Sequence, residues 1–323
     1  MKTRVALLLA TLVLSGTAAA QTHRFTPTGG VATFAVRPPV LRVKPGDTVV
    51  SPTFSVPGDY YEKDGGAWPG EVGPFYVEGA APGDTLLVKI LKVELNRDTA
   101  VSAIRPAGLS ALATDGRLRL LNDPLPSRRF VWQLDRQRGV AILDLPRSAA
   151  RRVEIPLAPM VGRVAVAPAG EEAFGGLWPG AFGGNMDAPD IREGATVHLP
   201  VFHEGALFYF GDIHAAQGDG EVCGSGLETT AVVTMQFDLV KGRRIAWPRI
   251  EDDGHLMVAG SARPLIDAFR IAHVELIEWL VADYGFEKLE AYQLVSQVGT
   301  ARIANVVDPL YTVVAKFPRA LLK

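Results

Sequence analysis

Asp212 and His214 stand two residues apart, directly after the apolar run Ala206–Phe210. The run is typical of a β-strand, and the side chains of a strand alternate between its two faces. If the strand continues past the run, Phe208, Phe210, Asp212 and His214 lie on one face. The carboxylate and the imidazole are then placed to share one cation. The two phenylalanines are then expected to line an apolar pocket beside it.

The segment Gly183–Glu228 carries further side chains with ligand atoms. Imidazole and carboxylate ligands together fit zinc or a similar divalent ion, and an oxygen-rich shell also accepts calcium. We therefore expect a divalent metal, zinc first and calcium as the alternative. The expected ligands are Asn185, Asp187, Asp212, His214 and Glu221.

The elements that must position these residues are mostly strands. Many short runs of strand-forming residues, separated by Gly and Pro turns, favour a β-sandwich or barrel. The runs are Val40–Val43, Thr48–Val50, Thr85–Val93, Phe130–Leu134, Gly139–Leu143, Val161–Val166, Thr196–Val201, Ala206–Phe210, Thr229–Leu239 and Thr312–Phe317. The tail differs, because Ser261–Tyr284 and Glu287–Val298 have helical patterns. Ser261 is expected to cap the first helix and Gly285 to end it.

The chain contains a short internal repeat. The segment GGAWPGEVG at 65–73 matches GGLWPGAFG at 175–183, and each is followed by a turn and an apolar strand. A related turn, PGDTV, occurs at 45–49. We interpret this as two related β units in one molecule. The second unit continues into Asn185 and Asp187 where the first is mostly apolar, which assigns the chemistry to the second unit.

Several segments resemble the acetamidase/formamidase family. GGNMD at 183–187 resembles its GGN-x-D motif, and GDIHAAQGDGEVCG at 211–224 matches its longest signature almost letter for letter. The segments 38–49, 73–87 and 289–318 resemble its N-terminal elements and its tail. The resemblance implies an α+β, mostly β fold with a β-sandwich-like core, a bound divalent metal, a homo-oligomer, and hydrolysis of short amides to acid and ammonia.

On this reading, a metal-assisted amide hydrolysis would use Asp219, Glu221 and His214 as its catalytic residues. Asp219 or Glu221 would take a proton from water and pass it to the departing nitrogen. Two alternatives stay open at the level of sequence. The chain could be an exported, non-catalytic metal- or carbohydrate-binding β-sandwich, or an amidase with Cys223 as its nucleophile.

The first twenty residues have the pattern of a cleaved signal peptide. Lys2 and Arg4 precede the uncharged run Val5–Leu14, and Ala18–Ala20 form a small-residue cleavage site. The domain prediction is therefore a signal over 1–20, a β-rich domain with the duplication over 21–250, and a C-terminal helical or α+β segment over 251–323. A periplasmic or secreted protein follows, without a membrane span.

Charge and cysteine content limit the partners. Without Lys2 and Arg4, 31 of the 33 basic residues remain against 35 acidic ones. This balance argues against a nucleic-acid partner, which needs a basic surface. Cys223 is the only cysteine, so the chain forms no internal disulfide. The core, a metal or oligomerisation must stabilise it instead, and the expected partner is a small amide.

The signal pattern predicts a mature protein that begins at Gln21. N-terminal sequencing of the exported protein should return Gln21 as the first residue, because signal peptidase cleaves after small residues such as Ala18 and Ala20. A protein that keeps Met1 and stays in the cytoplasm would contradict this prediction.

Overall fold

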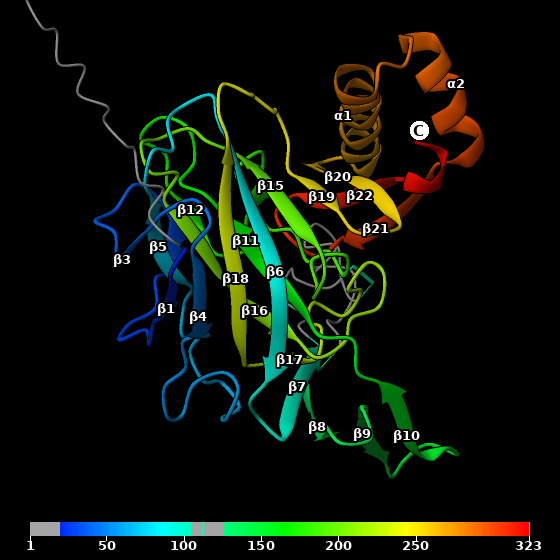
Figure 1. The fold of residues 1–323 in the computed structure, drawn as a ribbon. Helices are drawn as coiled ribbons and strands as arrows, with labels where there is room; N and C mark the ends of the chain where they lie inside the picture. The colour runs from blue at the N-terminus through cyan, green and yellow to red at the C-terminus, as the bar shows by residue number, and fades with distance from the viewer. Residues whose placement is uncertain (1–19, 105–110, 113–125, 323) are drawn as a thin grey trace, which may run out of the picture.

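Two large β-sheets dominate the computed structural model, which describes residues 20–104, 111–112 and 126–322 (Figure 1). Apart from Ala20, the predicted signal peptide lies outside the described residues. One sheet has nine strands in the order β1 (Thr22–Arg24), β4 (Thr48–Pro52), β18 (Ala231–Val240), β6 (Thr85–Leu95), β15 (Thr196–Pro200), β19 (Arg249–Glu251), β20 (His255–Ala262), β22 (Tyr311–Pro318) and β21 (Thr300–Asn305).

The second sheet has eleven strands. Nine follow one path: β10 (Arg151–Pro156), β9 (Val140–Leu145), β8 (Arg128–Asp135), β7 (Thr99–Ile104), β17 (Glu228–Thr229), β16 (Phe208–His214), β11 (Met160–Ala165), β14 (Gly183–Asn185) and β13 (Pro179–Gly180). Off this path, β5 (Val72–Val77) pairs with β16, and β3 (Leu41–Val43) pairs with β5. A short pair, β2 (Thr33–Phe34) and β12 (Phe174–Gly175), completes the strands of the described residues.

The core lies between the two sheets, as expected for a β-sandwich. Phe75 of β5 contacts Phe208 and Phe210 of β16 in its own sheet, and Phe237 of β18 in the other. All four rings are fully buried. The mostly β fold predicted from the sequence is confirmed, and every apolar run that predicted a strand overlaps an observed strand.

Two helices cover the C-terminal strands, as Figure 1 shows at its upper right. Buried residues of α1 (Leu265–Tyr284) and α2 (Lys288–Val298) pack against β20 and β22 in a second apolar cluster. Gly285 ends α1 with a φ of 70°, as predicted. The predicted start at Ser261 is wrong. Ser261 belongs to β20, where its hydroxyl bonds the Thr312 hydroxyl, and α1 begins only after Pro264.

The C-terminal segment is continuous with the rest of the nine-stranded sheet. The predicted boundary between residues 250 and 251 falls inside β19, which pairs with β15 on one side and β20 on the other. None of the helices in the described part of the chain is long and apolar enough to cross a membrane.

The two WPG segments occupy related places in the eleven-stranded sheet. The first leads into β5, which pairs with β16, and the second leads into β14, which pairs with β11. Because β16 and β11 pair with each other, the segments flank one central pair of strands. The turn glycines Gly46, Gly83 and Gly194 share φ values of 91°, 93° and 89°, and each turn leads into a strand of the other sheet. The duplication of a β unit stays a prediction from the sequence.

Phe75 should be the most sensitive of these core positions, because its ring touches both sheets. Phe75→Ala is expected to lower the free energy of unfolding by about 3–5 kcal/mol, as the removed ring leaves a cavity. Tyr292→Ala on α2, where the side chain is exposed, is the control and should change it by less than about 0.5 kcal/mol. Denaturant unfolding measures both variants, and similar effects would contradict the described core.

Candidate functional site

The end of β16 brings Asp212 and His214 together, but not beside the phenylalanines. Asp212 has a φ of 58°, in the left-handed region that interrupts the alternation of a strand. Phe208 and Phe210 therefore point into the sandwich core, while His214 Nε2 lies 3.4 Å from Asp212 Oδ1. The predicted proximity of the carboxylate and the imidazole is confirmed. The prediction that Phe208 and Phe210 share their face and line the pocket is wrong.

His214 is the centre of a buried cluster of acids. Its Nε2 also lies 3.2 Å from Glu228 Oε2, from the short strand β17 beside β16. The cluster contains three overlapping sets of three residues. Within each set, every residue has one possible ligand atom within 4.8 Å of those of the other two. The sets are Asp187 with Asp212 and His214, His214 with Glu221 and Glu228, and Asp187 with Glu221 and Asp308.

Asn185 connects the second WPG unit to the C-terminal loop between β21 and β22. Its side-chain amide donates to Asp187 Oδ2 at 2.7 Å and to Asp308 Oδ2 at 2.6 Å. Both amide hydrogens are thereby used, and its carbonyl oxygen accepts from Arg163. Asn185 therefore orients the two carboxylates through its amide nitrogen.

Arg163 brings a buried positive charge to one side of the cluster. Its guanidinium pairs with Glu71 and lies 3.2 Å from Asp212 Oδ2. The Trp68 ring covers it, with the guanidinium carbon 4.4 Å from the ring centroid. The Trp68 indole N–H donates to Glu71 Oε1 at 2.9 Å. Since Trp68 and Glu71 belong to the first WPG unit, both units contribute to the site. The assignment of the chemistry to the second unit alone is wrong.

Gln217 selects the tautomer of His214. The Gln217 amide nitrogen donates to the carbonyls of Asp187, at 2.8 Å, and Ala304, at 3.0 Å. Its carbonyl oxygen must therefore accept from His214 Nδ1, which lies 2.8 Å away. With the hydrogen on Nδ1, the Nε2 atom of a neutral His214 presents its lone pair to the cluster. This is the form in which histidine binds a metal.

The cluster holds more buried carboxyl groups than positive charges, and this shifts their pKa values. Burial raises the pKa values of Asp187 and Glu221 well above their usual range, and neighbouring carboxylates raise them further. Burial also raises the pKa of Asp308, to about 8. Burial acts the same way on Asp212, but Arg163 and His214 outweigh it and hold its pKa well below the usual range. Burial lowers the pKa of His214, yet Glu228 and Asp212 raise it well above the usual value.

The backbone at the site adopts conformations that L residues rarely use. Asp187, Asp212 and Glu221 have φ values of 42°, 58° and 49°. Such residues concentrate at functional sites, where the surrounding structure holds them in place. Position 226 requires glycine because the backbone there lies close to the His214 ring, and a Cβ would be 2.5 Å from His214 Nδ1.

The donor set fits a divalent cation. Among the described residues, Asp187 Oδ1, His214 Nε2 and Glu228 Oε2 are buried and make no well-aligned hydrogen bond, although the last two atoms lie 3.2 Å apart as an ion pair. Orphaned acceptors in the interior are costly, and a cation satisfies several of them at once. Carboxylates with one imidazole suit zinc, and the many oxygens also suit calcium.

A cavity of about 510 Å³ adjoins the cluster. Its lining includes Asn185, Asp187, Asp212, Glu221, Glu228 and Asp308. Asp219, predicted as catalytic, does not lie there. Its side chain is half exposed and pairs with Arg302 at 2.8 Å. Cys223 is half-buried, and its Sγ lies 3.6 Å from the Ser225 carbonyl oxygen, outside the set of described residues that line the cavity.

Several residues of the site were not predicted. The sequence contained one indication of Arg163, since it is the only charged residue in the otherwise apolar run Val161–Val166. Glu71 follows the first WPG where the second copy has Ala181, a difference that marks an added function. Asp308 gave no signal, because nothing near it in the sequence relates it to Asn185.

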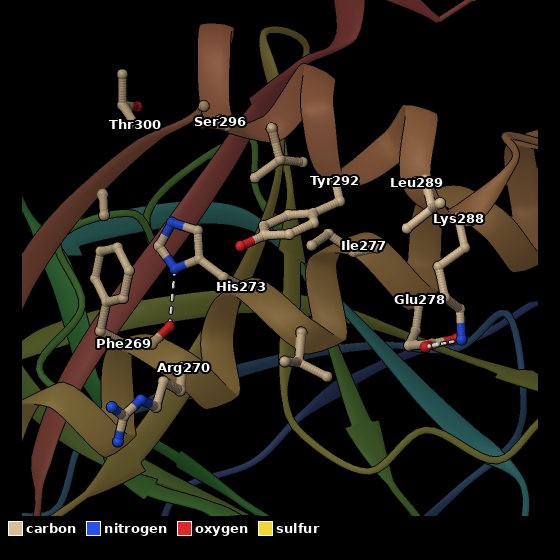
Figure 2. A pocket seen from close by; sticks show the side chains of 14 residues that line it. Phe269, Arg270, His273, Ile277, Glu278, Lys288, Leu289, Tyr292, Ser296 and Thr300 are labelled. Atoms are coloured by element: carbon tan, nitrogen blue, oxygen red, sulfur yellow. Dashed lines mark hydrogen bonds and ion pairs between the residues drawn. The ribbon is translucent and has the colours of Figure 1, made fainter.

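A second, larger hollow lies between α1 and α2, with a volume of about 680 Å³ (Figure 2). Phe269, His273 and Tyr292 line its middle, and Glu278 pairs with Lys288 at 2.7 Å at one end. It shares no lining residue with the cavity beside the acidic cluster. The candidate chemistry therefore lies in the smaller cavity.

Comparison with known proteins assigns the chain to a family. Residues 157–322 match the model of the Acetamidase/Formamidase family. An acetamidase from Mycolicibacterium smegmatis is 28% identical over 218 residues, 53% of each chain, so this chain spans about half the length of that relative. The crystal structure of an acetamidase from Yersinia enterocolitica is 35% identical with a TM-score of 0.85 and 96% coverage of both chains. A predicted acetamidase/formamidase from Thermoanaerobacter tengcongensis is 30% identical with a TM-score of 0.80, over 94% of this chain and 98% of that one. The chain belongs to the acetamidase/formamidase family.

Proposed function

We propose that the protein hydrolyses a primary amide to a carboxylic acid and ammonia, and that the reaction depends on a divalent metal. The observation that carries the proposal is the buried cluster of one imidazole and several carboxylates beside an accessible cavity, in which Asp187 Oδ1 has no hydrogen-bond partner. The family and the names of its relatives support the amide as the substrate.

Asp187, Asp212 and His214 would hold the metal, while Glu221, Glu228 and Asp308 belong to two neighbouring sets that overlap with this one. A bound divalent ion would act as a Lewis acid, polarising the amide carbonyl and acidifying water. Arg163 keeps Asp212 ionised, and Gln217 keeps the lone pair of His214 Nε2 directed at the cluster. The residues around the ligands thus prepare them for a cation.

Glu221 is the favoured general base. It lines the cavity, and burial together with the neighbouring carboxylates raises its pKa, which makes it a stronger base. It would take a proton from the attacking water as the carbon–oxygen bond forms. It would then give that proton to the nitrogen as the carbon–nitrogen bond breaks, so that ammonia leaves. Asp219 is not proposed for this role because it faces Arg302.

The alternative of a non-catalytic binding module is less well supported. A saturated metal site would leave little free space beside its ligands. Here the candidate ligands border a cavity of about 510 Å³, which leaves room for a substrate. Export to the periplasm, from the N-terminal pattern, and a homo-oligomer, from the family resemblance, complete the proposal.

Asp212→Asn and His214→Ala should lose metal and activity together. Loss of residues that merely orient metal ligands costs about 10–100-fold in affinity or activity, so loss of a ligand should cost at least a hundredfold in kcat/KM. Asp219→Asn is the matched control outside the cluster and should keep both. Elemental analysis and ammonia release from an amide panel, with and without a chelator, measure the outcome. Full metal occupancy and activity in Asp212→Asn would overturn the site.

Cys223→Ser separates the metal reaction from thiol catalysis. Because Cys223 lies outside the cavity lining, the variant should keep most of its activity, and a thiol alkylator should have little effect. A thousandfold loss in turnover in a folded variant, about 4 kcal/mol of transition-state stabilisation, would instead support the thiol as nucleophile.

A further inference from the structure

The cavity is much larger than the shortest amides require. Acetamide has four non-hydrogen atoms and fills roughly the space of two or three waters, at about 30 Å³ each. The cavity measures about 510 Å³, in the range of pockets that enclose much larger ligands. A metal ion with several waters still leaves most of this volume open. The size therefore leaves room for a substrate with more atoms than acetamide.

The part of the lining that carries no candidate ligand is mixed: it holds Asp64, Ser127 and Arg163, and also a group of apolar and aromatic side chains. Tyr60 and Trp68 are half-buried, with their ring centroids 5.8 Å apart. Leu177 and Val307 also line the cavity, and Leu177 is partly exposed. Such groups stabilise an apolar or aromatic substituent by removing it from water.

The loop that carries Tyr60 is held in place by many hydrogen bonds. Asp59 is buried and accepts from the Ser55 hydroxyl and from the backbone N–H groups of Val56 and Tyr61. Arg129 of β8 donates to the backbone carbonyls of Tyr60, at 3.2 Å, and Tyr61, at 2.9 Å. The aromatic wall is thus formed before a ligand arrives, which lowers the entropy cost of binding.

We infer that the acyl group of the substrate is larger than acetyl and ends in an uncharged aromatic or bulky apolar group that packs against Tyr60, Trp68 and Leu177. The inference rests on the proposed amide hydrolysis and defines its substrate class. The amide carbon lies toward the carboxylate cluster, and the apolar end lies toward the aromatic wall. The reaction itself is unchanged, with water adding to the carbonyl carbon and ammonia leaving.

Ammonia release from formamide, acetamide, hexanamide and phenylacetamide by the metal-loaded full-length protein tests the inference. We expect kcat/KM to be at least tenfold higher for phenylacetamide than for acetamide. If acetamide is the equal or better substrate, the inference is wrong while the proposed function stands. If none of the amides, including formamide, is hydrolysed, the proposed function itself fails.

Variants of the wall then test which residues contact the acyl group. Tyr60→Ala and, separately, Leu177→Ala should each lower the phenylacetamide-to-acetamide ratio of kcat/KM by about fivefold or more, and Tyr60→Phe should restore it. Tyr292→Ala makes the same change as Tyr60→Ala on α2, outside the cavity, and should leave the ratio unaltered. Equal losses for both substrates in Tyr60→Ala and in Leu177→Ala would show that the wall does not select the acyl group, and would overturn the inference.

Discussion

The excess of negative charge buried around His214 is the constraint on which the site depends. Asp187, Asp212, Glu221, Glu228 and Asp308 all lie within the interior, each less than a tenth exposed. The only guanidinium that pairs with these acids in the described part of the chain is Arg163, which Glu71 already partly neutralises. Buried charges without partners are strongly unfavourable, so the acids must take up protons or a cation. This imbalance explains both the direction of the pKa shifts and the suitability of the site for a metal.

Holding these acids together requires both sheets. Asp187, Asp212 and Glu221 occupy left-handed backbone conformations, each of which costs about 1–3 kcal/mol. Strand β21 of the nine-stranded sheet supplies part of the support, since the side-chain amide of Asn305 donates to the backbone carbonyls of Asn185 and Met186. The site is therefore a product of the packed sandwich, and the C-terminal loop between β21 and β22 belongs to it as much as β16 does.

The two WPG segments lead to side chains with complementary roles. Matched by their WPG segments, Asn185 and Asp187 of the second unit stand where the first has Phe75 and Val77. Phe75 serves the core between the sheets, while Asn185 orients carboxylates in the site. Glu71, where the second unit has Ala181, holds the guanidinium that keeps Asp212 charged. The segment beside β16 thus contributes to the core between the sheets, and the segment beside β11 contributes to the candidate site.

Local patterns in the sequence determined the strands, the left-handed turn glycines, the end of α1 at Gly285 and the proximity of Asp212 to His214. Each of these depends on residues close together in the chain, where propensity and period act directly. Only the tertiary structure decided that Arg163 meets Glu71, 92 residues away, and that Asn185 meets Asp308, 123 residues away. It also removed Phe208 and Phe210 from the pocket, because one residue with positive φ reverses the faces of a strand and no alternation rule anticipates it. Contacts between distant segments are set by how the two sheets pack, and that packing is a property of the whole core.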